Sequence, residues 1–271
     1  MKTTVKEEVN IFKFIIISSF LKRNVIVHVF LPADHAANKK LPLLLMNDGQ
    51  NMEEVGLKKS LQKLFNQKKI KPICCVAIEA GIDRKREYGV AGVPDYQCFG
   101  NKADLYTSFI LQELLPFLYK TYSELTFTSK SFAGFSLGGL SALDMVWNHP
   151  EVFQKAGIFS GSLWWRSVDT GDESYDDDKH RIMHQQIRKG KYHPGLKFFF
   201  QCGKLDETKD RNNNGVIDSI DDTLDVIKEL EAKGYDKNND ILYYEMPDGR
   251  HDMQTWGKAL PAFLIWAYGD S

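Results

Sequence analysis

Short, uninterrupted apolar runs recur along this chain, and segments with helical periodicity separate them from residue 40 onward. The clearest runs lie at residues 41–46, 73–78, 132–135, 156–159, 198–202 and 241–244. A continuous apolar run is typical of a strand that is buried on both faces, whereas a strand with one exposed face alternates. The runs therefore predict a mostly parallel sheet with helices packed against it.

The segments between the runs supply the helices, and the start of the chain supplies two more strands. Apolar residues at helical spacing mark segments at 55–65, 103–119, 137–147, 224–230 and 260–267. The apolar segments around 11–18 and 25–31 are close together and alternate more, which favours an antiparallel hairpin at the sheet edge. We expect about eight strands in one α/β domain that comprises residues 1–271.

Charge and cysteine content argue against several classes of protein. The 35 basic and 36 acidic side chains nearly balance, so nothing favours a nucleic-acid or membrane-surface partner. No apolar stretch approaches the roughly 18–20 residues of a bilayer-spanning helix, and no signal-peptide cleavage site follows residues 15–17. Cys74, Cys75, Cys98 and Cys202 lack metal-ligand spacing, so we expect buried free thiols. We expect a cytoplasmic protein, although a trimmed signal peptide would leave the same sequence.

A candidate nucleophile lies between a predicted strand and a predicted helix. Gly134-Phe135-Ser136-Leu137-Gly138 matches Gly-x-Ser-x-Gly, a pattern that about one chain of this length in ten contains by chance. Its position gives it weight, because a strand that turns directly into a helix is the nucleophile elbow of hydrolases. The tight turn needs glycine on both sides of the serine, and the helix N-terminus favours negative charge. The alternative is a glycine-rich turn with a capping serine.

The elbow predicts that an acid and then a histidine follow the serine along the chain. Of the seven histidines only His251 lies beyond the last predicted strand, in the polar segment 247–252. The acid should follow the strand at 198–202, where Asp206 comes first and Glu207 and Asp210 compete. We favour Asp206 as the residue that orients the imidazole. The alternatives are an exposed turn histidine and a capping aspartate.

An oxyanion hole needs two backbone N–H groups. The elbow predicts that of Leu137 as one, and the loop after the strand at 41–46 as the source of the other. In that loop we favour Gln50, with Asn51 as the next choice. The alternative is an ordinary turn rich in Asn, Asp and Gly.

With these residues in place, the chain resembles the Putative esterase family, which includes esterase D, feruloyl esterases and the catalytic domain of enterochelin esterases. The resemblance covers roughly residues 25–268. Its motifs are Asp48-Gly49-Gln50-Asn51, Arg86-Glu87-Tyr88, Phe109 with Glu113-Leu114, Gly134 to Gly139, Gly203-x-x-Asp206, and His251-Asp252 with Trp256. The resemblance implies an α/β-hydrolase fold and ester hydrolysis through an acyl-serine, with Ser136 as nucleophile, Asp206 as acid and His251 as base. It implies no particular substrate.

Two loops, at residues 79–102 and 161–179, are too long for mere connections and are expected over the active site. They carry the pocket candidates, which are Arg84, Arg86, Tyr88 and Tyr96 in the first loop and Trp164 and Trp165 in the second. An aromatic and cationic rim would suit an aromatic or anionic acyl group. The alternative is that these side chains only pack under their loops. Two other functions remain open, a thioesterase or acyltransferase and a non-catalytic carbohydrate- or siderophore-binding module.

A segment after the predicted acid matches an EF-hand calcium loop. Its candidate ligands are Asp210, Asn212, Asn214, the carbonyl of Val216, Asp218 and Asp221, with Gly215 at the sixth position. It departs from the pattern because aspartate replaces the final glutamate and no helix precedes it. A structural calcium ion and a plain Asn/Gly turn before an acidic helix start are equally favoured. Catalysis itself requires no cofactor.

Overall fold

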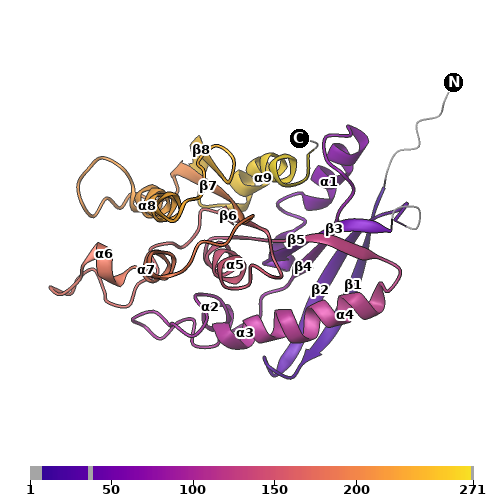
Figure 1. The fold of residues 1–271 in the computed structure, drawn as a ribbon, viewed down its shortest axis with the longest axis horizontal. Helices are drawn as coiled ribbons and strands as arrows, with labels where there is room; N and C mark the ends of the chain where they lie inside the picture. The colour runs from indigo at the N-terminus through magenta and orange to yellow at the C-terminus, as the bar shows by residue number, and fades with distance from the viewer. Residues whose placement is uncertain (1–7, 36–38, 270–271) are drawn as a thin grey trace.

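The protein forms one eight-stranded sheet with helices on both faces (Figure 1). The computed structural model describes residues 8–35 and 39–269, so the expected domain limits at residues 1 and 271 lie outside the described residues. In chain order the strands are β1 (Val9–Ser18), β2 (Arg23–Pro32), β3 (Lys40–Asn47), β4 (Cys74–Ile78), β5 (Thr126–Phe135), β6 (Lys155–Phe159), β7 (Lys197–Leu205) and β8 (Ile241–Arg250).

The strand order across the sheet is β1-β2-β4-β3-β5-β6-β7-β8. All pairs from β4 to β8 are parallel, whereas β1 pairs with β2 and β2 with β4 in antiparallel fashion. The predicted edge hairpin and the mostly parallel α/β-hydrolase sheet are therefore confirmed. Because parallel strands end on the same side, the loops after β3, β5, β6, β7 and β8 all meet at one edge of the sheet.

Two helical layers bury the two faces of the sheet. One apolar core joins α1 (Leu57–Asn66) and α9 (Met253–Tyr268) to the sheet. The other core joins the opposite face to α3 (Ala103–Phe109), η2 (Ile110–Leu114), α4 (Leu115–Thr121), α5 (Leu137–Asn148), α7 (Ile182–Lys189) and α8 (Asp218–Lys233). The predicted helix at 103–119 is thus present, but its middle, η2, is a π-helix.

Three features differ from the sequence-based expectation. Short helices α2 (Arg84–Glu87) and α6 (Asp177–His180) lie inside the two long loops, and α7 was not predicted. The segment 247–250, predicted as a turn, is strand, because β8 continues beside β7 until Arg250 pairs with Leu205. Cys98 is exposed, whereas the other three free cysteines are buried as expected. Within the described ranges, no helix is long and apolar enough to cross a bilayer.

Candidate active site

Ser136 lies on a strained turn between β5 and α5. Its φ of 53° and ψ of −123° fall where an L-residue is rarely found. Its N–H donates to the Phe159 carbonyl at 2.8 Å, which fixes the turn against β6. A Cβ at Gly134 would lie 2.3 Å from the Gly138 carbonyl oxygen, so this turn cannot close with a larger residue there. Close backbone contact therefore explains Gly134, whereas a Cβ at Gly138 would meet side chains, 2.8 Å from Asp48 Oδ2 and 3.0 Å from Asn47 Cβ.

The helix that follows Ser136 supplies the first predicted oxyanion donor. Leu137 is the first residue of α5 and lines a cavity together with Ser136. The N–H groups in the first turn of a helix have no intrahelical acceptor, so that of Leu137 is available to an anion. Gln50 is the second residue of the short helix η1 (Gly49–Asn51) after β3, and its side-chain oxygen accepts from the Ala80 N–H at 3.0 Å. The role of its backbone N–H stays a prediction.

Asp206 and His251 are adjacent because the strands that carry them end together. Leu205 at the end of β7 pairs with Arg250 at the end of β8. Asp206 directly follows Leu205, and His251 directly follows Arg250. The strands approach closely here, since a Cβ at Gly203 would lie 2.4 Å from the Gly249 carbonyl carbon. Asp206 and His251 line one cavity of about 210 Å³.

The electrostatics of this pair suit an acid that holds a base. Burial raises the pKa of Asp206, while the nearby Ser160 hydroxyl, the Gly203 N–H and His251 partly oppose the rise. Desolvation lowers the pKa of His251, and the Asp206 carboxylate partly offsets it. Asp206 Oδ2 accepts from the Gly203 N–H at 3.1 Å, whereas the buried Oδ1 has no partner in the described structure. Oδ1 is thus the atom free to accept an imidazole N–H.

Trp256 on α9 contacts all three parts of the predicted triad region. Its ring stacks on Phe135, the residue before Ser136, with centroids 5.0 Å apart. It lies edge-on to the His251 ring at 5.1 Å, and its Nε1–H donates to Ser160 Oγ at 2.9 Å. Ser160 lines the cavity of Asp206 and His251. One buried indole therefore holds the serine strand, the histidine and the surroundings of the acid in a fixed relation.

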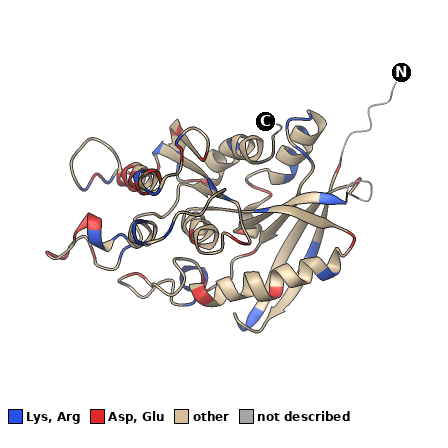
Figure 2. Ribbon diagram, viewed as in Figure 1, with Lys and Arg blue, Asp and Glu red and all other residues tan. Residues whose placement is uncertain are grey.

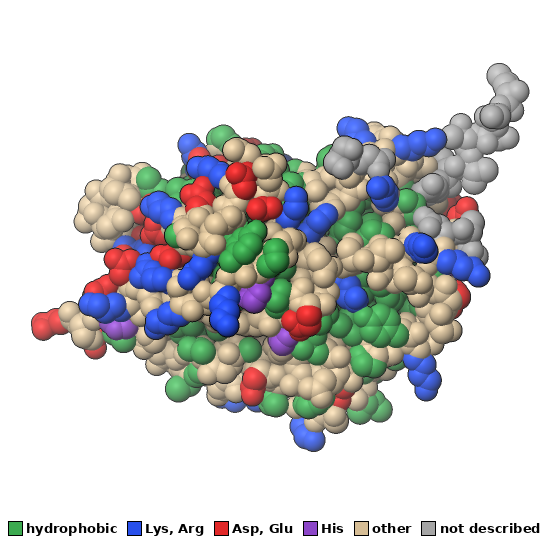
Figure 3. Space-filling view, in the orientation of Figure 1, with side chains coloured by type: hydrophobic (Ala, Val, Ile, Leu, Met, Phe, Trp, Pro, Cys, Tyr) green, Lys and Arg blue, Asp and Glu red, His purple; other side chains and the backbone are tan. Residues whose placement is uncertain are grey.

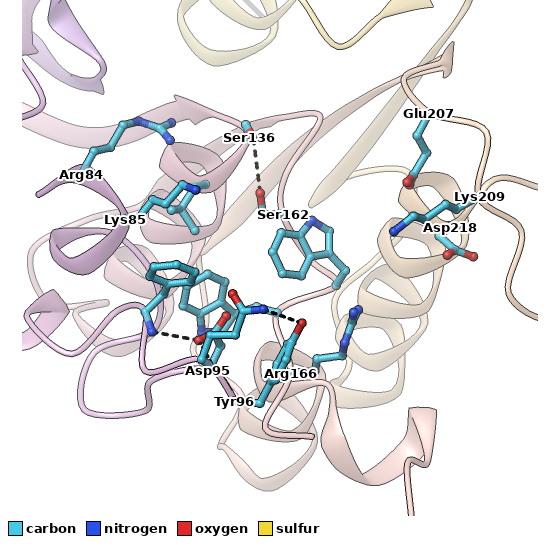
Figure 4. A pocket seen from close by; sticks show the side chains of 15 residues that line it. Arg84, Lys85, Asp95, Tyr96, Ser136, Ser162, Arg166, Glu207, Lys209 and Asp218 are labelled. Carbon is cyan, nitrogen blue, oxygen red and sulfur yellow. Dashed lines mark hydrogen bonds between the residues drawn. The ribbon is translucent and has the colours of Figure 1, made fainter. Parts of the chain in front are cut away.

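The cavity at Ser136 has a volume of about 430 Å³ and is drawn in Figure 4. Trp164 lines this cavity and also that of Asp206 and His251, so the two cavities are neighbours. Of the predicted pocket residues, Arg84, Trp164 and Trp165 line the Ser136 cavity. Tyr88 lies below it instead, with no exposed surface, and its hydroxyl accepts from the Asp48 N–H at 3.2 Å.

Several lining residues were not identified from the sequence. The hydroxyl of Ser162 lies 3.3 Å from that of Ser136, and its N–H donates to the Ser136 carbonyl. Its place three residues after β6, at the edge where the loops after the parallel strands meet, is a signal that could have found it. The remaining missed residues that line the Ser136 cavity include Lys85, Asp95, Arg166 and Lys209, whereas Tyr96, a pocket candidate, does line it. Only the folded loops bring these side chains together.

The predicted calcium loop folds around the carboxylate of Asp221. The amide nitrogens of Asn212 and Asn214 lie 3.0 and 2.8 Å from Asp221 Oδ2. Asp210 accepts from the N–H groups of Asn214 and Gly215, and Gly215 has the left-handed φ of 83°. Among residues 8–35 and 39–269, no three His, Cys, Asp or Glu side chains converge as metal ligands. Asp218 accepts from the Arg211 N–H, and calcium binding by this loop stays a prediction.

The chain is similar to proteins of known sequence and structure over nearly its whole length. It is 24% identical over 246 residues to the uncharacterized protein YbbA of Bacillus subtilis, covering 89% of this chain and 91% of YbbA. The Shigella flexneri enterobactin esterase FES superposes with a TM-score of 0.72 at 22% identity, over 95% of this chain but only 58% of FES. A ferulic acid esterase superposes with a TM-score of 0.69 at 19% identity, over 97% of this chain and 98% of that protein.

The chain also matches the sequence profile of a protein family. The match begins at the end of β1 and ends in the last turn of α9, so it includes the elbow, the acid segment and His251. Because the profile of the Putative esterase family matches residues 18–267, the chain belongs to this family.

Proposed function

We propose that this protein is a serine carboxylesterase with Ser136 as nucleophile, His251 as general base and Asp206 as the acid that orients it. One observation carries the proposal: two cavities lie next to each other and share Trp164. Ser136 lines one of them, and Asp206 and His251 line the other. The strained backbone of Ser136 supports the same role, because strain of this kind gathers at active sites.

The reaction follows from these positions. His251 accepts the hydroxyl proton of Ser136 as the serine oxygen attacks the ester carbonyl, and Asp206 stabilises the imidazolium. The Leu137 N–H, with that of Gln50, donates to the oxyanion of the tetrahedral intermediate. The imidazolium returns the proton to the leaving alcohol, and water then hydrolyses the acyl-serine by the reverse sequence. No step needs a cofactor.

Relatives support an ester of small-molecule size as the substrate. The similar structures are an enterobactin esterase, a ferulic acid esterase and a siderophore hydrolase. A cavity of about 430 Å³ lies within the range that small-molecule sites occupy. A thioesterase or acyltransferase would use the same triad with another leaving group or acceptor, and a panel of ester and thioester substrates separates them.

The decisive variant is Ser136→Ala. We expect kcat on a short-chain 4-nitrophenyl ester to fall at least about 10³-fold, because the acyl-enzyme cannot form. A fluorophosphonate probe should label the parent protein and leave this variant unlabelled. Ser167→Ala, which changes an exposed serine of the second long loop, is the matched control and should keep both properties. A folded parent protein that takes no label would instead favour a non-catalytic binding module.

A further inference from the structure

Two lysines face each other across the cavity of Ser136. Lys85 comes from the loop after β4 and Lys209 from the loop after β7, and both side chains line the cavity. Figure 4 shows them on opposite sides, with an indole ring between them and Ser136 above. Both residues are exposed, so a molecule entering the cavity meets both ammonium groups.

The acidic side chains of this cavity are already engaged by other groups. Asp95 Oδ1 accepts from the N–H groups of Gln97 and Phe99 at 2.9 Å each. Glu207 accepts from the Ser219 N–H at 2.7 Å. Asp218 lies 3.3 Å from the guanidinium of Arg211. None of these carboxylates forms an ion pair with Lys85 or Lys209.

The two arginines of the cavity differ from the lysines because protein groups already surround them. Arg84 donates to both carboxylate oxygens of Asp48, at 2.6 and 2.8 Å. Arg166 lies over the rings of Tyr96 and Trp164 and 3.8 Å from Asp169. In the described residues, no carboxylate lies within 4.0 Å of the ammonium of Lys85 or Lys209, and the Lys85 ammonium lies 5.3 Å from the centroid of the Phe99 ring.

Since the whole chain carries a net charge of only −1, these lysines are not part of a generally basic surface. Asp95, Glu207 and Asp218 line the same cavity, but among the described residues Lys85 and Lys209 are its cations that no carboxylate contacts within 4.0 Å. An anion placed between two cations in a partly enclosed cavity is attracted more strongly than on an open surface. The indole of Trp164 is exposed and lines the same cavity, so it offers an apolar face for the rest of the bound molecule.

We propose that the substrate is an ester that carries a negative charge, which binds between Lys85 and Lys209 while its apolar part lies against Trp164. This inference rests on the proposed esterase function and adds the chemical class of the substrate. The two lysines determine specificity and take no part in bond breaking. They act in binding, and the bond chemistry stays with Ser136 and His251.

The test compares esters that differ only in charge. Mono-4-nitrophenyl glutarate carries a carboxylate at the end of its acyl group, and in 4-nitrophenyl 5-methylhexanoate an isopropyl group replaces that carboxylate. A second pair, the butyrates of 4-nitrophenol and 3-carboxy-4-nitrophenol, places the charge in the leaving group. After subtraction of the enzyme-free rate, we expect at least one anionic ester to exceed its neutral partner about 10-fold in kcat/KM. Raising the ionic strength from about 0.05 to 0.5 M should reduce this preference.

The variants locate the effect. Lys85→Gln and Lys209→Gln should each lower kcat/KM for the favoured anionic ester about 3- to 10-fold more than for its neutral partner. Lys204→Gln is the control, because this exposed lysine of the same segment as Lys209 lies outside the cavity and pairs with Glu245. Equal rates on both members of each pair, or equal losses on charged and neutral esters, would overturn the inference.

A binding measurement separates this inference from the proposed function. The Ser136→Ala protein is titrated with the charged and neutral esters by calorimetry, so no turnover is needed. Tighter binding of the anionic ester that Lys209→Gln abolishes would support the charge site, even if the parent protein neither hydrolyses esters nor takes the fluorophosphonate label. Labelling of Ser136 together with charge-independent binding would contradict the charge site alone.

Discussion

The two walls of the Ser136 cavity are attached to the rest of the protein in different ways. The first wall, residues 79–102, is fixed to the central framework. Arg23 of β2 donates to both oxygens of the buried Glu87 carboxylate at 2.8 and 2.7 Å. On α5, the helix that begins after the nucleophile, Ser141 accepts from the Gly89 N–H at 2.8 Å and Asp144 accepts from the Ala91 N–H at 3.0 Å.

The second wall, residues 161–179 with 206–218, depends on a network of charges. Arg211 lies 2.9 Å from Asp177 of α6 and 2.7 Å from Asp222 of α8. Arg181, which precedes α7, pairs with Asp222 at 2.8 Å and Asp225 at 2.9 Å. Figure 2 shows that acidic residues are concentrated on α6 and α8. Figure 3 shows acidic and basic side chains mixed over the left side of the molecule, where these helices lie.

This difference indicates how each wall responds to change. The first wall shares the elbow helix and the sheet with the catalytic centre, so its position is set by the same packing that sets Ser136. Its ion pairs, Arg23–Glu87 and Arg84–Asp48, join it to β2 and to the end of β3. The second wall, which carries Trp164 and Lys209, is instead ordered by ion pairs that join loops and outer helices to one another. Charge, salt and a bound cation should therefore affect the second wall more than the first.

The largest expected effect comes from Arg181→Met. Arg181 and Asp222 are 4% and 1% exposed, so the change leaves a buried carboxylate with only Arg211 as a partner. We expect the free energy of unfolding to fall by about 3–5 kcal/mol, the usual cost of breaking a buried ion pair. Urea denaturation measures it, with an unchanged m-value as the check on a two-state transition.

Arg188→Met, on the helix α7 that begins directly after Arg181, is the matched control. Arg188 pairs with Asp178 and Glu229, but 39% of its side chain is exposed. An exposed pair contributes about 0–1 kcal/mol, so this variant should stay close to the parent protein. Equal losses in the two variants would show that the buried network has no special role in the second wall.

A medium effect is expected from calcium. If the loop from Asp210 to Asp221 binds Ca²⁺, the ion stabilises the segment that bears Lys209 and Asp218. At a concentration 100-fold above its dissociation constant the ion would add about 2.7 kcal/mol of stability. We expect Tm to rise in millimolar CaCl₂ and to fall again with EDTA, measured by calorimetry, whereas MgCl₂ should have little effect.

Asp221→Asn keeps the size of the side chain and removes the charge on which Asn212 and Asn214 converge. It should abolish the response of Tm to calcium. If the Tm of the parent protein is the same in EDTA and in CaCl₂, the segment binds no calcium and is a plain turn held by Asp221. The comparison of the walls would then rest on the ion pairs alone.

The sequence predicts what short-range rules determine. The alternation of buried runs and helical segments predicts the sheet. The strand–Gly-x-Ser-x-Gly–helix order predicts the elbow, since the tight turn leaves no room for a Cβ at Gly134. The position of Asp206 directly after β7 and of His251 directly after β8 follows from the same strand order, although the register that pairs Leu205 with Arg250 does not. The extra length of β8 was missed because Pro247 and Gly249 are typical of turns.

The structure of the cavity walls could not be predicted from the sequence, because contacts between residues far apart in the chain determine it. Arg211 and Asp177 are 34 positions apart, and no local pattern links them. Tyr88 was placed in the pocket because its neighbours are cationic and aromatic, yet it is buried where it packs on Tyr106 with ring centroids 5.2 Å apart. Lys85 and Lys209 lie in different loops, and only the folded structure shows that both line the Ser136 cavity.

The smallest effect tests the first wall through Ser141→Ala. The variant removes the hydroxyl that accepts from the buried Gly89 N–H, and one unpaired buried amide costs about 1–3 kcal/mol. Because Glu87 and Asp144 still hold the wall, we expect the lower end of this range and a kcat/KM within about twofold of the parent. Native-state hydrogen exchange at the Gly89 and Ala91 amides is the local measurement.

Faster exchange at Gly89 alone would indicate that the polar contacts of the first wall act independently. Faster exchange at both amides, together with a large loss of activity, would show that the first wall depends on its polar contacts as much as the second wall does.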